Sequence, residues 1–196
     1  FAFGLDRERK YDVVIKIKKD GSTNKIVKNV PMTPITVLLG TLILIISAKI
    51  KVPLYPIPMT LQPLAVLMIG MLFGRNLGIA SVGLYIMQGL WFPVFAFGGG
   101  LSYIMGPTGG FILGFLFSVY VVGSLADKGW GKNISTSLIS MLIGYLIIYF
   151  FGLTYFSFLF GYEIALEKAV YPFMLKDFYT LLFAGLLMPQ IWKLAK

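Results

Sequence analysis

Two side chains with strong hydrogen-bonding chemistry lie inside apolar stretches of this sequence. Asp177 lies about one helical turn into the apolar run 173–194, and Gln62 lies near the start of the run 60–73. A carboxylate within a bilayer is costly unless it is paired or bound. We therefore interpret Asp177 as the acceptor for a ligand that carries N–H groups, or else as a rim carboxylate that faces water beside Lys176. Gln62 is either a second ligand contact or an ordinary hydrogen bond between helices.

Irregular segments flank these apolar runs. The motifs VPLYPIP and AFGGGLSYIMGPTGG concentrate proline and glycine, and non-helical backbone at membrane depth is tolerated only where it is buried in protein or lines a cavity. They predict a ligand pocket, with tight turns between short helices as the alternative. The aromatic residues nearby are either pocket walls or members of an interfacial belt, and the main ones are Trp91, Phe95 and Tyr103.

The sequence lacks the residues that most enzymes use for catalysis. It contains no cysteine and no histidine, which removes thiolate metal sites and the commonest general base at neutral pH. It also contains no Walker motif, HExxH or GxSxG. We therefore expect no enzymatic activity, no metal site and no cofactor. Active transport would need energy from a partner protein or an ion gradient.

Composition indicates that lipid surrounds the elements that carry these residues. Hydrophobic residues make up 58% and charged residues 13% of the 196 residues, and the mean hydropathy is +0.84, far outside the range of soluble domains. A membrane-spanning helix needs about 20 mainly apolar residues. We predict an all-α polytopic membrane protein with six transmembrane helices, at residues 33–49, 60–73, 77–95, 107–126, 135–156 and 173–194.

The polar residues 1–32 form a segment separate from the six-helix domain at residues 33–196. Within it, YDVVIKIKKDGSTNKIV alternates apolar and polar residues on either side of Asp20-Gly21, which is typical of a β-hairpin. An isolated hairpin is marginally stable in water, so disorder is the alternative. Because the sequence begins at Phe1 and not at Met, we expect a fragment or a processed form.

The net charge of +9 indicates membrane topology and not nucleic-acid binding. With an even number of crossings both termini share one side, and 13 of the 17 Lys and Arg residues fall on that side. Cytoplasmic loops carry the excess of basic residues, so both termini are predicted to be cytoplasmic. This orientation places the two irregular motifs, the loop 163–168 and Asp177 on the external side, where the predicted pocket would open.

The first predicted helix carries two small residues four positions apart, Thr36 and Gly40. Small residues at this spacing let another helix approach closely. Packing inside the protein and docking of a partner subunit would both use such a face, and the spacing does not choose between them.

Five motifs follow one another between residues 34 and 196: P-x-x-P-x-P-x-T-L-Q, L-F-G-x-x-x-G, Y-x-x-x-G-x-x-x-P-V-F, G-P-T-G-G and P-F-x-x-x-D. In order and spacing they resemble the BioY family, the biotin-specific S-components of energy-coupling factor (ECF) transporters. The resemblance implies a six-helix protein of the bacterial cytoplasmic membrane, surrounded by lipid, that captures biotin from the external side. It also implies docking to a transmembrane coupling subunit and two cytoplasmic ATPase subunits.

The resemblance also implies roles for individual residues. Asp177 matches the family's Asp in P-F-x-x-x-D, and biotin's ureido ring offers two N–H donors that a carboxylate accepts more strongly than a neutral group does. Thr36 and Gly40 fall where the family carries a small-xxx-small docking motif. The family usually reads G-D-x-x-K around its Asp, whereas this chain has Lys176 in place of the Gly and Thr180 in place of the Lys.

This departure leaves the partner of the ligand carboxylate open. A lysine at −1 lies on a different helix face from one at +3, so the candidates are Lys176, Lys49 and Lys51. Trp91 stands where many family members are small, and it would either narrow the pocket or stack on the ligand's bicyclic ring. We expect the proline-rich loop after the first span and the glycine-rich loop before the fourth to close over the ligand.

Three alternatives compete with biotin capture. Thr180 in place of the family lysine favours an S-component for a different vitamin. A small membrane-embedded enzyme would need clustered acidic or histidine residues at the cytoplasmic ends, where the sequence has only Asp127. A structural or assembly subunit without a ligand would leave Asp177 without a purpose.

Overall fold

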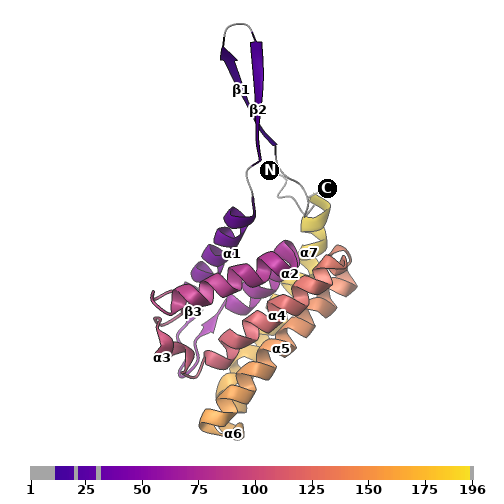
Figure 1. Ribbon diagram of the computed structural model, residues 1–196. Helices are drawn as coiled ribbons and strands as arrows, with labels where there is room; N and C mark the ends of the chain where they lie inside the picture. Colours follow the sequence, from indigo (N-terminus) through magenta and orange to yellow (C-terminus); the bar gives the residue numbers. More distant parts are fainter. Residues whose placement is uncertain (1–11, 20–21, 30–31, 195–196) are drawn as a thin grey trace.

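The computed structural model describes residues 12–19, 22–29 and 32–194. The chain is mostly helical over these residues, and its long helices pack side by side in one bundle (Figure 1). The elements in chain order are β1 Asp12–Lys19, β2 Ser22–Asn29, α1 Met32–Lys49, β3 Lys51–Val52, β4 Met59–Thr60, α2 Gln62–Gly89, α3 Leu101–Ile104, α4 Gly109–Asp127, η1 Trp130–Lys132, α5 Ile134–Phe160, α6 Tyr162–Ala169 and α7 Tyr171–Leu194.

Helix α2 contains two of the predicted spans, folded back on each other. Gly74 interrupts the helix with φ 72° and ψ −171°, a backbone conformation that is essentially restricted to glycine. The second half then returns along the first, so that a Cβ atom added to Gly78 would lie 3.6 Å from the Cα atom of Gly70. The break that the sequence predicts at residues 74–76 is therefore a tight elbow inside α2.

Within the described residues, three helices are long and apolar enough to cross a membrane, namely α2, α4 and α5. Helices α6 and α7 pass the same test together, although they are bent by 46° at the break between them, which gives up to four spans. The predicted count of six transmembrane helices is not confirmed. The described residues form seven α-helices, α2 counts as one element despite its elbow, and α1 is apolar but shorter.

Helix bounds differ most from the prediction beyond the ends of the apolar runs. The third span was predicted at residues 77–95, but the helix that contains it, α2, ends at Gly89. The predicted loop 163–168 is wrong, because α5 continues to Phe160 and α6 covers this region. Gly161, with φ 89°, turns the chain between these two helices. Charged residues make α6 too polar to be recognised from hydropathy alone.

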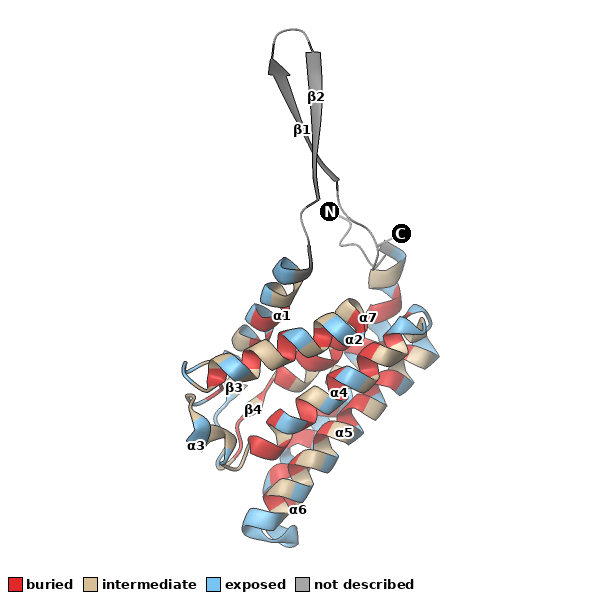
Figure 2. Cartoon of the chain, viewed as in Figure 1, coloured by how far each residue is buried: buried red, intermediate tan, exposed pale blue. Residues whose placement is uncertain are grey.

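Burial follows the inner faces of the helices (Figure 2). Helix α2 packs against α1 and α4, α4 packs against α5, and α5 packs against α7. The outward faces carry large apolar side chains that are more than half exposed, such as Leu38, Leu146, Phe150 and Phe183. Monomeric soluble proteins avoid such extended apolar surfaces, and a bilayer covers them.

Two short antiparallel pairs lie outside the helices. Strands β1 and β2 pair from Asp12↔Asn29 to Lys19↔Ser22, and the turn predicted at Asp20-Gly21 lies outside the described residues. Strands β3 and β4 pair at the base of the proline-rich loop. As predicted, this loop is not helical, because its prolines cannot donate the backbone hydrogen bonds of a helix; residues 55–57 form a bend where an extended backbone was expected.

Candidate ligand-binding site

A cavity lies between the two irregular loops and helices α2, α4, α5 and α7. About 570 Å³ of space lies between these residues, part of which is open to solvent. Among the described residues that line it, Lys176 and Asp177 are the only charged ones. The uncharged polar residues of the lining are Thr60, Gln62, Tyr103, Thr108 and Tyr149, and its phenylalanines are Phe95, Phe111, Phe115 and Phe173.

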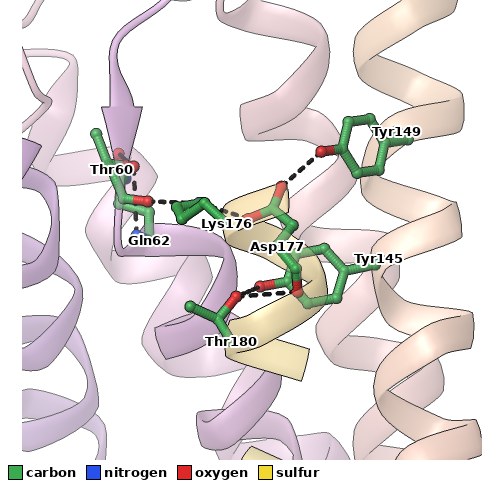
Figure 3. A network of polar contacts seen from close by, with 7 residues as sticks. All are labelled: Thr60, Gln62, Tyr145, Tyr149, Lys176, Asp177 and Thr180. Carbon is green, nitrogen blue, oxygen red and sulfur yellow. Dashed lines mark hydrogen bonds and ion pairs between the residues drawn. The ribbon is translucent and has the colours of Figure 1, made fainter. Parts of the chain in front are cut away.

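Asp177 lies at the centre of the polar contacts in Figure 3 and is 7% exposed. The Tyr149 hydroxyl of α5 donates to its Oδ2 atom at 2.5 Å, and the Lys176 Nζ atom lies 2.5 Å from its Oδ1 atom. Oδ1 accepts no well-aligned hydrogen bond from the described residues, so its contact with Lys176 is an ion pair alone. A carboxylate has about four acceptor positions, and Asp177 therefore keeps capacity for further donors.

Lys176 enters the cavity even though its Cα atom lies on a different helix face from the position of Thr180. Its ammonium group donates to the Thr60 carbonyl oxygen at 3.0 Å as well as pairing with Asp177. The side chains of Lys176 and Asp177 are only 20% and 9% exposed. The lysine side chain is long enough to reach the cavity from a different face of the helix, and the ion pair is largely shielded from water.

Gln62 takes part in a buried hydrogen-bond network and also lines the cavity. Its Nε2 atom donates to the Tyr85 hydroxyl at 2.7 Å across the elbow of α2, and its Oε1 atom accepts from Thr60 Oγ1 at 3.3 Å. The backbone N–H of Gln62 also donates to Thr60 Oγ1 at 3.3 Å. Gln62 thus makes a hydrogen bond between two helical segments, which was one of the two roles considered from the sequence. It also lines the cavity, where a ligand could reach it.

Thr180 lies outside the described lining of the cavity. Its hydroxyl donates to the Asp177 carbonyl oxygen at 3.1 Å and lies 2.7 Å from the Tyr145 hydroxyl. Since the threonine proton is used on the carbonyl, Tyr145 is the donor in the second bond. Thr180 therefore joins α7 to α5 behind Asp177, and the predicted ligand contact at Thr180 is not supported by this placement.

Phe95 and Tyr103 form an aromatic wall, whereas Trp91 does not take part in it. Their rings stack at a centroid distance of 5.0 Å, and Phe95 also meets Tyr85 edge-on at 5.3 Å. Burial raises the pKa of Tyr103 above its ordinary value, so its hydroxyl stays neutral. Trp91 is 72% exposed and absent from the described lining, because α2 ends at Gly89 and the following turn points outward.

Lys49 and Lys51, the other two candidates for a ligand carboxylate, also lie outside the described cavity lining. The Lys49 ammonium donates to the carbonyl oxygens of Pro93 and Phe95. The Lys51 ammonium donates to that of Ala96. Both lysines hold the loop after α2, and neither faces the space where a ligand would lie.

Of the two predicted docking residues, Gly40 is buried inside the protein. A Cβ atom at Gly40 would lie 2.5 Å from Ser81 Oγ, so any larger residue where α1 crosses α2 would force its neighbours to shift. The neighbouring Thr41 donates to the Ser81 carbonyl oxygen at 3.0 Å. Internal packing therefore accounts for the small residue at position 40, while Thr36 is half-buried one turn earlier.

The sequence did not point to Tyr145 and Tyr149, which supply donors to Thr180 and Asp177 from α5. The available signal is two tyrosines at i and i+4 within an apolar span, which places both on one helix face. Thr60 and Phe111 were also missed, because their residue types are unremarkable. Among the described residues, no group of three or more His, Cys, Asp or Glu could hold a metal ion.

A second hollow adjoins the cavity at the two irregular loops. It is lined by Pro56 and Pro58 of the proline-rich loop and by Phe97 and Gly98 of the glycine-rich loop, among others. Pro58, Tyr103 and Thr108 line both spaces, which makes the hollow the mouth of the cavity.

Comparison with known proteins identifies the family of the chain. The sequence model of the BioY family matches residues 19–196. The chain belongs to the BioY family. The BioY proteins that resemble it include a "Probable biotin transporter BioY" of Pyrococcus horikoshii, which is 36% identical over 134 residues, covering 67% of this chain and 78% of the relative. The "Biotin transporter BioY" of Thermotoga maritima is 34% identical over 160 residues, covering 79% of this chain and 92% of the relative.

The fold of this BioY family member also has a counterpart among solved structures. A crystal structure of the S-component for biotin from an ECF-type ABC transporter superposes with a TM-score of 0.71 and 25% sequence identity. The match covers 82% of this chain and 90% of that chain. Family membership identifies the chain as a multi-pass membrane protein of a transporter family and not as an enzyme.

Proposed function

We propose that this chain is the substrate-binding component of an ECF-type vitamin transporter and that it captures biotin from the external side of the membrane. The observation that carries the proposal is the buried Lys176–Asp177 pair in a mainly apolar and aromatic cavity of a BioY family member. Biotin is the transported ligand, and the function includes no catalytic step and no cofactor.

The charged pair suits the ureido ring of biotin. A ureido group presents N–H donors beside a carbonyl acceptor, and Asp177 with Lys176 presents an acceptor beside a donor 2.5 Å apart. Hydrogen bonds with ionised partners are roughly twice as strong as neutral ones. The apolar ring system of the ligand then lies against Phe95 and Tyr103, whose stacked rings offer a flat surface.

The ligand carboxylate lies toward the mouth of the cavity in this arrangement. It is separated from the ureido ring by the fused ring and a chain of methylene groups, so Lys176 cannot serve both ends of an extended ligand. The proline-rich and glycine-rich loops that line the mouth are the segments that would close over it.

The topology belongs to the same proposal. The chain crosses the membrane six times, by α1, the two halves of α2, α4, α5 and the α6–α7 pair, with both termini in the cytoplasm. The elbow at Gly74 and the distribution of 13 of the 17 Lys and Arg residues support it. Residues 33–196 are the ligand-binding domain in the bacterial cytoplasmic membrane, and residues 1–32 are a cytoplasmic segment.

The partners in this proposal are a transmembrane coupling subunit and two cytoplasmic ATPase subunits, because the sequence has no ATP-hydrolysing motif of its own. Thr36 belongs to the proposed docking face. Gly40 contributes to it indirectly, through the packing of α1 on α2.

Isothermal titration of the detergent-purified chain with biotin tests the ligand. We expect saturable binding that Asp177→Asn weakens by about 2 kcal/mol, or roughly 30-fold, because the charged acceptor of a ureido N–H is replaced by a neutral amide. Glu163→Gln, which neutralises an exposed carboxylate of α6, is the matched control and should leave the affinity unchanged. Binding of riboflavin or thiamine in place of biotin would overturn the ligand, and tight binding by Asp177→Asn would overturn the site.

A further inference from the structure

Two lysines near the outer end of α1 hold the loop that follows α2. The Lys49 ammonium donates to the carbonyl oxygens of Pro93 at 2.6 Å and Phe95 at 2.7 Å. The Lys51 ammonium donates to the Ala96 carbonyl oxygen. Three backbone carbonyls within four residues thus accept hydrogen bonds from two lysines, one at the end of α1 and one in β3. Both lysines lie more than 40 positions away in sequence.

These contacts are unlike ordinary surface ion pairs. Among the described residues, neither Lys49 nor Lys51 pairs with a carboxylate, whereas Lys168 and Lys176 both do. The Lys51 ammonium also lies 3.9 Å from the centre of the Phe97 ring, which adds a cation–π attraction. Each lysine therefore directs its charge onto the 93–97 segment, with hydrogen bonds to a charged donor that are stronger than neutral ones.

The segment held in this way supplies a wall of the cavity. The Phe95 side chain is 1% exposed, lines the cavity and stacks on Tyr103. Its amide donates to the Gly98 carbonyl oxygen at 2.9 Å, and its ring fills the space that a Cβ atom at Gly89 would occupy. A shift of the 93–97 backbone would therefore displace Phe95 from the aromatic wall.

We propose that Lys49 and Lys51 are positioning residues, which set the affinity of the cavity for its ligand by fixing the 93–97 segment and through it Phe95. This inference rests on the proposed function for its ligand, biotin. It differs from a direct role of either lysine in binding the ligand's carboxylate, because their ammonium groups donate to backbone carbonyls and neither lysine belongs to the described cavity lining.

The test compares biotin with biotinamide, in which the carboxylate is replaced by a neutral amide. Lys49→Met and Lys51→Met should each weaken both ligands to the same extent, by about tenfold or more for Lys49. Lys49→Arg should restore most of the affinity, because a guanidinium group also donates to two carbonyls. Lys168→Met, which removes an exposed lysine of α6, is the matched control. A loss confined to biotin would establish direct carboxylate contact and overturn the inference, as would no loss with either ligand.

A double-mutant cycle with Phe95→Leu tests the route of the effect. If the lysines act through Phe95, then Lys49→Met should cost much less affinity in the Phe95→Leu background than in the wild type. Full additivity of the two substitutions would contradict the inference.

Hydrogen–deuterium exchange of the ligand-free protein separates this inference from the proposed function. Amides of residues 94–98 should exchange faster in Lys49→Met, while those of α5 should keep the wild-type rate. If the wild type binds no biotin, the proposed function fails, and the exchange result still decides whether the lysines fix the segment. Unchanged exchange at residues 94–98, or faster exchange throughout the chain, would overturn the positioning role.

Discussion

Lys176→Met is expected to lower the thermal stability of the ligand-free protein, because it leaves the Asp177 carboxylate buried without its cation. Removing one partner of a buried ion pair costs about 3–5 kcal/mol. We take the lower end, about 3 kcal/mol, since Tyr149 still donates to Asp177 and the Lys176 side chain is 20% exposed. At about 2–4 °C per kcal/mol for a chain of this size, the midpoint should fall by about 6–12 °C.

The double variant Lys176→Met/Asp177→Asn makes this prediction specific to charge pairing. It removes both charges and keeps an acceptor for the Tyr149 hydroxyl, and replacing a whole buried pair by neutral groups is often harmless. Its midpoint should therefore lie well above that of Lys176→Met and close to the wild type, while biotin affinity is lost. Thermal unfolding in detergent, followed by the fluorescence of the three tryptophans, measures all the variants.

The matched control is Lys168→Met. The side chains of its ion pair, Lys168 and Glu167, are 47% and 65% exposed, and pairs of this kind contribute about 0–1 kcal/mol. The midpoint should therefore stay near that of the wild type. A Lys176→Met midpoint as close to the wild type as that of Lys168→Met would refute the reasoning, and so would a double variant no more stable than the single one.

Further predictions concern the same unfolding midpoint or the biotin affinity. Gly40→Ala should lower the free energy of unfolding by about 1–3 kcal/mol through overpacking, because its Cβ atom would lie 2.5 Å from a side chain of α2. Its control, Gly83→Ala, has nothing within 4 Å of the added atom and should be neutral or stabilising. Equal effects of the two substitutions would contradict the close α1–α2 contact. Gly74→Ala should cost about 1–3 kcal/mol from backbone strain at φ 72°, which the same unfolding experiment measures. Thr180→Val should lower the free energy of unfolding by about 1 kcal/mol, because the hydrogen bond with Tyr145 is lost. It should change the biotin affinity little in titrations. A large loss of affinity would place Thr180 at the ligand.

The sequence predicted the elements whose signal is local. Long apolar runs identified the helices, and the two ends of α4 and the start of α7 lie within two residues of their predicted positions. Glycine at position 74 marked the elbow of α2, because its conformational freedom is a property of the residue itself. Asp177 stood out because a carboxylate in an apolar run needs a partner.

The parts that the sequence missed depend on which helix faces meet. Tyr149 and Tyr145 contribute hydrogen bonds only because α5 packs against α7, and nothing within the fifth span reveals that neighbour. Lys49 and Lys51 were two of the three candidates for the ligand carboxylate, and their ammonium groups donate to backbone carbonyls of a loop distant in sequence. Trp91 was interpreted either as a pocket wall or as a member of an interfacial belt, and it is 72% exposed beyond the end of α2 at Gly89.

The elbow of α2 has a consequence for the order in which the cavity is built during synthesis. Because the helix doubles back, Gln62 meets Tyr85 only 23 residues later, and the aromatic wall of Phe95 and Tyr103 follows within the next 20 residues. Contacts of such short sequence separation form early, so this half of the site can assemble while the rest of the chain is still on the ribosome. Lys176 and Asp177 are added with α7, the last helix, so a nascent chain can form the aromatic wall before it gains the charged pair of the site.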